Sequence, residues 1–146
     1  MNFLYILYIL EGDQVYQFAF ETEKECYNKV LEKKQNRYKI YREDKAKPVN
    51  FSPALEWDYE KNDVKLNIQK TKEIKISHFR LLREEVFKNL DILFMKAVES
   101  GNQTKIAEIA EIKQQLRDIT TLDLPNTEEE LLNYMPECLF RGILLK

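Results

Sequence analysis

Hydrophobic residues dominate the start of the chain and predict a strand. The segment from Phe3 to Leu10 is apolar throughout and rich in Tyr and Ile, which favour extended structure. The polar residues EGD follow and QVYQFAF resumes the apolar pattern, so Gly12 is expected to form the turn of a β-hairpin. The apolar run is about half the length of a membrane-spanning helix and no basic segment precedes it. We therefore expect neither a signal peptide nor a membrane anchor.

Both faces of this first strand are apolar, which leaves two interpretations. The strand is either buried at the centre of the sheet of its own domain, or one of its faces is covered by another chain. The second interpretation predicts that Tyr5 or Tyr8 contacts a partner subunit.

The pattern up to residue 69 predicts a small α+β unit. Thr22 and Glu25 have the spacing of a capping box, which predicts a short helix. The apolar stripe of this helix is expected to contain Tyr27, Val30 and Leu31. RYKIY predicts a third strand, the prolines of EDKAKPVNFSP predict a loop, and ALEWDYEKNDVKLNI predicts a second hairpin.

Residues 70–146 predict a second, helical unit. No Gly or Pro occurs from residue 70 to residue 100, so we expect one helix of about 45 Å there. Its apolar positions are spaced by three and four residues: Ile76, Phe79, Val86, Leu90, Leu93 and Ala97. Three more apolar side chains widen this stripe and are expected to pack on a neighbouring subunit or on the α+β unit: Leu82, Phe87 and Phe94.

A second helix is expected to return antiparallel to the first. Gly101 suits the end of the long helix, and Asn102 or Thr104 can cap the next one. The returning apolar face contains Ile106, Ile109, Ile112, Leu116 and Ile119. Thr127 and Glu130 form another capping box, which predicts a short C-terminal helix ending before Pro136. The final CLFRGILLK is apolar enough for a docking strand or tail.

The hairpin geometry predicts two charge pairs between its helices. With a turn near Gly101, Asp91 lies opposite Lys113, and Arg83 lies within a turn of Asp118. These pairs would clip the hairpin, the Arg83–Asp118 pair at its base, although charges on long helices are commonly only solvated. Arg117 would then face outward, free to bind a carboxylate or backbone carbonyls of a partner.

The charge balance argues against nucleic acid as a partner. The chain has 23 Lys and Arg against 25 Asp and Glu, so the basic excess of nucleic-acid or acidic-membrane binders is missing. Three Gly and four Pro in 146 residues favour long regular elements over loops. Cys26 and Cys138 have no metal-binding spacing, and we expect both to be reduced thiols.

Candidate catalytic chemistry is sparse. His78 is the single histidine and no Cys or carboxylate cluster accompanies it at ligand spacing, so we expect no metal site. Glu56, Asp58 and Glu60 alternate along one strand, as paired carboxylates would, but the solvated face of a strand whose Trp57 points inward explains them equally well. We expect no catalytic residues, no cofactor and no enzymatic activity.

The segments LREEVFKNLD and IKQQLRDIT together carry a distinctive charge pattern. It resembles the C-terminal domain of bacteriophage tail assembly chaperones and tail-fibre-associated proteins, which carry an Arg eight residues before an Asp and later an aromatic-Arg-Gln-x-Leu-Arg-Asp-Ile-Pro string. Arg83 and Asp91 match the first pair. The second string is matched, with Lys for the family's Arg, by Lys113, Gln114, Leu116, Arg117, Asp118 and Ile119. The capped segment NTEEELLNYMP is also similar, and the resemblance covers residues 57–139.

The chain departs from this family pattern at three positions. Ile92 replaces a Trp, Ile112 replaces the aromatic residue, and Thr120 replaces the closing Pro. These changes fit a wider set of phage tail proteins that share the helical hairpin.

The resemblance implies a structural protein of the virion, made in the host cytoplasm. Its expected partners are other phage tail or fibre subunits, with which it would be oligomeric in the assembly. One alternative is a non-virion assembly chaperone for a tail or fibre protein. Another is a small cytosolic regulator or an enzyme with an unrecognised site.

Overall fold

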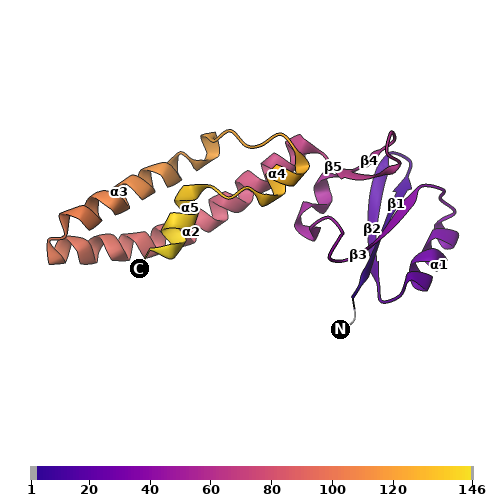
Figure 1. Ribbon diagram of the computed structural model, residues 1–146, viewed down its shortest axis with the longest axis horizontal. Helices are drawn as coiled ribbons and strands as arrows, with labels where there is room; N and C mark the ends of the chain where they lie inside the picture. Colours follow the sequence, from indigo (N-terminus) through magenta and orange to yellow (C-terminus); the bar gives the residue numbers. More distant parts are fainter. Residues whose placement is uncertain (1–2, 146) are drawn as a thin grey trace. The chain divides into compact units, whose positions relative to one another are not determined.

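The computed structural model describes residues 3–145 and has the expected mixed α+β class (Figure 1). The chain divides into two compact units, residues 1–71 and residues 72–146. The first contains all the strands and is called the head; the second contains most of the helical residues and is called the helical unit. The sequence had placed this boundary between residues 69 and 70.

The head is built on a three-stranded antiparallel sheet of order β2-β1-β3. Its strands are β1 (Tyr5–Glu11), β2 (Gln14–Phe20) and β3 (Tyr38–Arg42). A two-residue turn joins β1 to β2, and Gly12 adopts a φ of 65° there. Positive φ at the first central residue is the requirement of a type II′ hairpin turn, which explains why glycine stands at this position.

β1 lies at the centre of this sheet, and this explains why both of its faces are apolar. One face contributes Ile6, Tyr8 and Leu10 to a cluster with Trp57 and Val64. The other contributes Leu7 and Ile9 to a cluster with Cys26 and Val30 of α1 (Glu23–Lys33). The interpretation of β1 as a central strand buried in its own domain is therefore confirmed.

The expected capping box starts α1, but the expected apolar stripe is partly wrong. Thr22 Oγ1 accepts a hydrogen bond from Glu25 N at 3.2 Å. Val30 is buried together with Cys26, four residues earlier, whereas Leu31 is 74% exposed and Tyr27 is 48% exposed. The side of α1 that faces the sheet contains Cys26 and Val30. Leu31 is the next residue after Val30, so its side chain points away from that side and into solvent.

A second hairpin covers the other face of the sheet. Its strands are β4 (Leu55–Asp58) and β5 (Asp63–Leu66), and Trp57 points inward, as expected. The expected loop before it contains a short 3₁₀ helix, η1 (Val49–Ala54). Tyr41 of β3 donates from its hydroxyl to Asp63 Oδ2 at 2.5 Å, which links the sheet to this hairpin.

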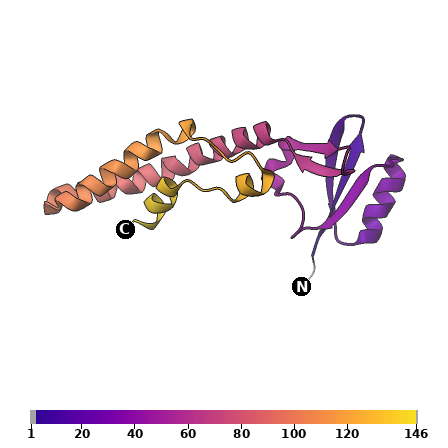
Figure 2. The ribbon, with the colours of Figure 1, turned by 45° about the horizontal axis from the view of Figure 1, so that its top comes forward.

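The helical unit contains the antiparallel hairpin that the sequence predicted. Its long helices are α2 (Ile68–Ser100) and α3 (Gln103–Arg117), which lie side by side in Figures 1 and 2. Gly101 adopts a φ of 68° at the turn, and Asn102 Oδ1 caps α3 by accepting from Lys105 N at 3.1 Å. The facing stripes bury Phe79, Val86, Leu90, Ala97, Ile109, Ile112 and Leu116.

Three shorter elements complete this unit. They are η2 (Ile119–Thr121), α4 (Glu128–Asn133) and α5 (Glu137–Leu144). Thr127 caps α4 as expected, accepting from Glu130 N at 3.3 Å. The expectation that the C-terminal segment is a strand or tail is wrong, because it forms helix α5 beside α2 (Figure 2).

Candidate partner-binding surfaces

The base of the helical hairpin is closed by Arg83, but not through the partner that the sequence suggested. Arg83 Nη1 of α2 donates to the backbone carbonyl of Leu116 at 3.4 Å. Asp118 instead follows the end of α3, where its Oδ2 accepts from Gln114 Nε2 at 3.3 Å. Carbonyls in the last turn of a helix lack the usual amide partner, so the one at Leu116 attracts a cationic donor. The predicted Arg83–Asp118 pair is therefore not formed.

The second predicted pair is present further along the hairpin. Lys113 Nζ lies 2.5 Å from Asp91 Oδ1, joining α3 to α2. The side chain of Asp91 is 61% exposed and that of Lys113 is 19% exposed, so solvent screens the pair from one side only. Lys113 Nζ also lies 5.3 Å from the ring centroid of Phe94, whose face attracts the ammonium group.

The remaining predicted contact residues of the hairpin are partly accessible. Leu82, Phe87 and Phe94 are half-buried, so each keeps surface that a neighbour can cover. Arg117 is exposed, but its Nη1 donates to Gln114 Oε1 at 3.1 Å along the same helix. A partner that binds Arg117 would compete with this intrahelical bond.

Helix α5 packs closely against both long helices at Gly142. A Cβ added at Gly142 would collide with Val86 Cγ1 of α2 and would lie 3.7 Å from Ile112 Cγ2 of α3. The absence of a side chain thus allows α5 to approach the hairpin closely. Arg141 Nη1 lies 3.7 Å from Glu111 Oε1 and adds an ion pair to α3. The sequence signal was available, since a helix face of Cys138, Leu139 and Gly142 recurs at helical spacing.

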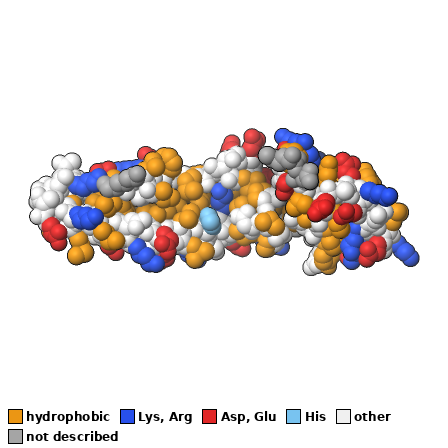
Figure 3. Space-filling view, turned by 90° about the horizontal axis from the view of Figure 1, so that it is seen from below, with side chains coloured by type: hydrophobic (Ala, Val, Ile, Leu, Met, Phe, Trp, Pro, Cys, Tyr) orange, Lys and Arg blue, Asp and Glu red, His pale blue; other side chains and the backbone are white. Residues whose placement is uncertain are grey.

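The opposite face of α5 is apolar and exposed. Phe140, Ile143 and Leu144 have exposed fractions of 56%, 53% and 60% and are spaced by three and four residues, which places them on one side of the helix. We call these three residues the α5 stripe. Hydrophobic side chains also gather among charged ones on the surface of the helical unit in Figure 3. An amphipathic helix that keeps apolar side chains in solvent is typical of an interaction site.

A further apolar set lies on α2, facing away from the hairpin seam. Leu81, Ile92 and Met95 are each more than half exposed and fall on one side of the helix at 100° per residue. Leu81 and Met95 lie outside the predicted apolar stripe that faces α3, and Ile92 drew attention only as the residue that replaces the family's Trp.

Lys75 is a buried cation that the sequence analysis missed. Its Nζ donates to the carbonyls of Leu132 and Tyr134 at 3.1 and 2.8 Å and so ties α2 to the end of α4. Burial lowers the pKa of this ammonium group. Lys75 precedes Phe79 by one helical turn, within the apolar stripe, and this position was the available signal.

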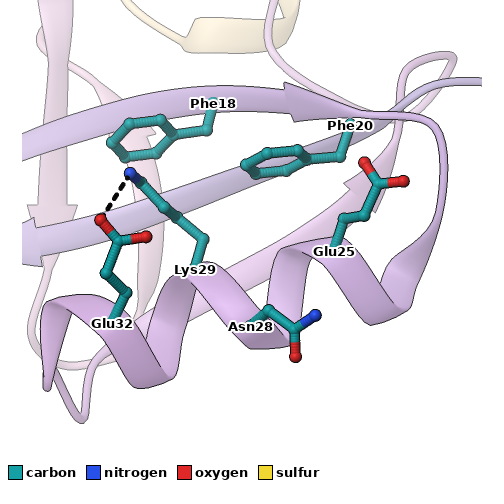
Figure 4. A pocket seen from close by; sticks show the side chains of 6 residues that line it. All are labelled: Phe18, Phe20, Glu25, Asn28, Lys29 and Glu32. Atoms are coloured by element: carbon teal, nitrogen blue, oxygen red, sulfur yellow. Dashed lines mark hydrogen bonds and ion pairs between the residues drawn. The ribbon is translucent and has the colours of Figure 1, made fainter.

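The head presents an open groove of about 380 Å³ between β2 and α1. Phe18 and Phe20 of β2 stack with ring centroids 6.5 Å apart and form one wall, as Figure 4 shows. Lys29 of α1 lies over the Phe18 ring at 5.0 Å and pairs with Glu32 at 3.3 Å. The groove therefore offers aromatic surface flanked by both signs of charge.

Tyr8 is not available to a partner, contrary to the expectation for the first strand. It is fully buried, and its hydroxyl accepts from Lys47 N at 2.9 Å. Tyr5 is half-buried and packs with the α1 cluster. The second hairpin covers one face of β1 and α1 covers the other, so β1 is buried without a partner chain.

The residues considered for catalysis or metal binding either are exposed or bond to their neighbours in the fold. His78 is exposed on α2. Glu56 contacts Lys65 and Asn67, and Asp58 Oδ1 accepts from the turn amide of Glu60 at 3.0 Å, so these carboxylates serve the second hairpin.

Three other expectations concern cysteines, metals and membranes. Cys26 and Cys138 are free and buried thiols. Within residues 3–145, no group of three His, Cys, Asp or Glu side chains is placed to hold a metal ion. None of the helices formed by these residues combines the length and apolar character needed to cross a membrane.

No protein-family model, curated protein or solved structure matches the chain. The resemblance to phage tail proteins therefore rests on the sequence motifs alone.

Proposed function

We propose that the protein is a phage tail or tail-fibre-associated structural protein that joins subunits of the virion. The proposal rests on the family resemblance of the hairpin and on the α5 stripe, the observation that most directly supports protein contact. The hairpin residues Arg83, Asp91 and Lys113 serve to hold the surface in shape, since each bonds within the helical unit.

The α5 stripe is a suitable centre for such a contact. Burying a side chain such as Phe140, Ile143 or Leu144 contributes about 1.5 to 3 kcal/mol each. Gly142 and Leu139 anchor the other face of the helix, so the stripe is held before a partner arrives. The expected occupant is an apolar helix or groove of another tail subunit.

The test combines surface variants with analysis of assembled particles. Phe140→Glu together with Leu144→Glu should leave the isolated protein folded but remove it from particles, because charged side chains cannot be buried against an apolar partner. Leu31→Glu is the control, since Leu31 is 74% exposed and lies in the head. Incorporation of the stripe variant at the control level would contradict the proposal.

Mass spectrometry of purified particles separates the structural role from the alternative of an assembly chaperone. A structural subunit is present in the finished particle, whereas a chaperone is found only with tail or fibre subunits in the lysate before assembly. Absence from both would favour a cytosolic regulator or enzyme.

A further inference from the structure

The outer edge of β2 carries backbone groups that no other strand pairs with in residues 3–145. Leu10 N donates to Arg37 O, and Glu43 N donates to Leu4 O, so even-numbered residues at both ends of β1 direct their polar groups toward β3. The odd-numbered residues of β1 therefore pair with the even-numbered residues of β2. It follows that Val15, Gln17 and Ala19 direct their N–H and C=O groups to the free edge.

This edge lacks the features that usually prevent pairing with another strand. The seven residues of β2, QVYQFAF, include no charged residue, proline or glycine. The opposite edge strand, β3, is two residues shorter and carries Lys39 and Arg42, which are the kind of charges that discourage strand addition. β2 is thus the edge that is open to a partner.

Gln17 marks the centre of β2. Its Oε1 atom is buried and accepts no hydrogen bond within the part of the chain that the structure describes. Gln17 lies opposite Tyr8 in the strand register, so its side chain is on the face of the sheet that the second hairpin covers. Gln17 is also the middle residue of β2, with three strand residues on either side.

We propose that β2 pairs antiparallel with β2 of a second copy of this chain, about a two-fold axis at Gln17. This register places Gln17 opposite its own copy at the two-fold axis. Val15 then lies opposite Ala19 of the second copy, and all three of these outward-directed residues form hydrogen-bonded pairs. No other two-fold register pairs β2 over its whole length.

The side chains on the α1 face fit the same arrangement. Tyr16 lies opposite Phe18 of the second copy, so two aromatic cross-strand pairs form, one on each side of the axis. Tyr16 is 43% exposed, and Phe18 forms a wall of the groove in Figure 4. Pairing therefore covers aromatic surface that the single chain leaves in water. It uses the head alone and does not depend on the α5 stripe.

Sedimentation equilibrium of the full chain over a range of concentrations tests the proposal. The wild type should show a monomer–dimer equilibrium. Ala19→Lys places a charge on the free edge, and Ala19→Pro removes an outward N–H without touching the bonds to β1; each should raise the dissociation constant at least tenfold. Leu31→Lys is the control in the same unit and should leave the equilibrium unchanged.

Disulfide trapping tests the register itself. Opposed residues of a hydrogen-bonded antiparallel pair have Cα atoms about 5.5 Å apart, within the reach of a disulfide. Gln17→Cys should therefore form a covalent dimer on mild oxidation, whereas Asp13→Cys in the turn should not. A monomer at all concentrations, equal trapping at both positions, or a dimer that Phe140→Glu abolishes and Ala19→Lys does not would each overturn the proposal.

Discussion

Arg83 of α2 donates to the backbone carbonyl of Leu116, at 3.4 Å, and not to the carboxylate of Asp118. The acceptor of the Arg83 hydrogen bond is therefore a neutral carbonyl at the end of a helix and not a charged carboxylate. The register of the hairpin base thus depends on one cation and a helix terminus.

This relationship predicts unequal effects of two substitutions. Arg83→Met should lower the free energy of unfolding by about 1 to 2 kcal/mol, because it removes the hydrogen bond but keeps most of the packing. Asp118→Ala should change it by less than about 0.5 kcal/mol, since that side chain is exposed. Chemical denaturation of both single variants and the double variant should give additive costs. A coupling energy above about 0.5 kcal/mol would indicate that the two side chains interact after all.

Gly142→Ala should destabilise the protein even though alanine favours helices. Alanine is better than glycine in a helix interior by about 1 kcal/mol, but here its methyl group would collide with Val86. We expect a net loss of about 1 to 3 kcal/mol in thermal or chemical unfolding. Adding Val86→Ala should make the double variant less costly than the sum of the two, because it removes the colliding group. Leu144→Ala, on the exposed side of α5, is the matched control and should have little effect.

Tyr8 and Tyr5 should respond differently to loss of the hydroxyl. Tyr8→Phe removes the hydrogen bond from Lys47 N and should cost about 1 kcal/mol, whereas Tyr5→Phe should be nearly neutral. Tyr8→Lys should unfold the head, because it buries a charge beside Trp57. Fluorescence of this single tryptophan reports the change. A folded Tyr8→Lys variant with native fluorescence would contradict the buried position.

Stability should fall in alkaline solution through Tyr41. Burial, followed by the hydrogen bond to Asp63, raises the pKa of this phenol above its usual value of 10.0. Above about pH 10 the unfolded chain loses this proton while the folded chain retains it, so the contribution is complete below that pH and is lost as pH rises further. Denaturation at about pH 8 and about pH 10.5 should show a smaller decline for Tyr41→Phe than for the wild type. An equal decline in both would exclude Tyr41 as the cause.

Local signals in the sequence were sufficient to predict most elements of the fold. Thr22, Asn102 and Thr127 cap their helices because the hydrogen bond of a cap lies within a few residues of chain. Gly12 and Gly101 mark turns because a positive φ is a property of one residue. The Asp91–Lys113 pair was predictable by counting from the turn, since both helices are regular up to that point.

Tertiary packing decided the features whose causes lie far apart in the chain. β1 is central because β3 pairs with the edge that β2 leaves free, and Tyr8 is buried because the second hairpin covers its face of the sheet. The helical spacing of Cys138, Leu139 and Gly142 was visible in the sequence, but the surface of Val86 and Ile112 against which Gly142 packs was not. Arg83 donates to the carbonyl of Leu116, while Asp118 accepts from Gln114 one turn earlier in its own helix. The sequence by itself determined most of the elements and the register of the hairpin, through contacts within a few residues. Which face of a strand or helix is buried, and which group a buried polar atom bonds to, depended on segments far away in the sequence. Those segments come together only when the chain folds.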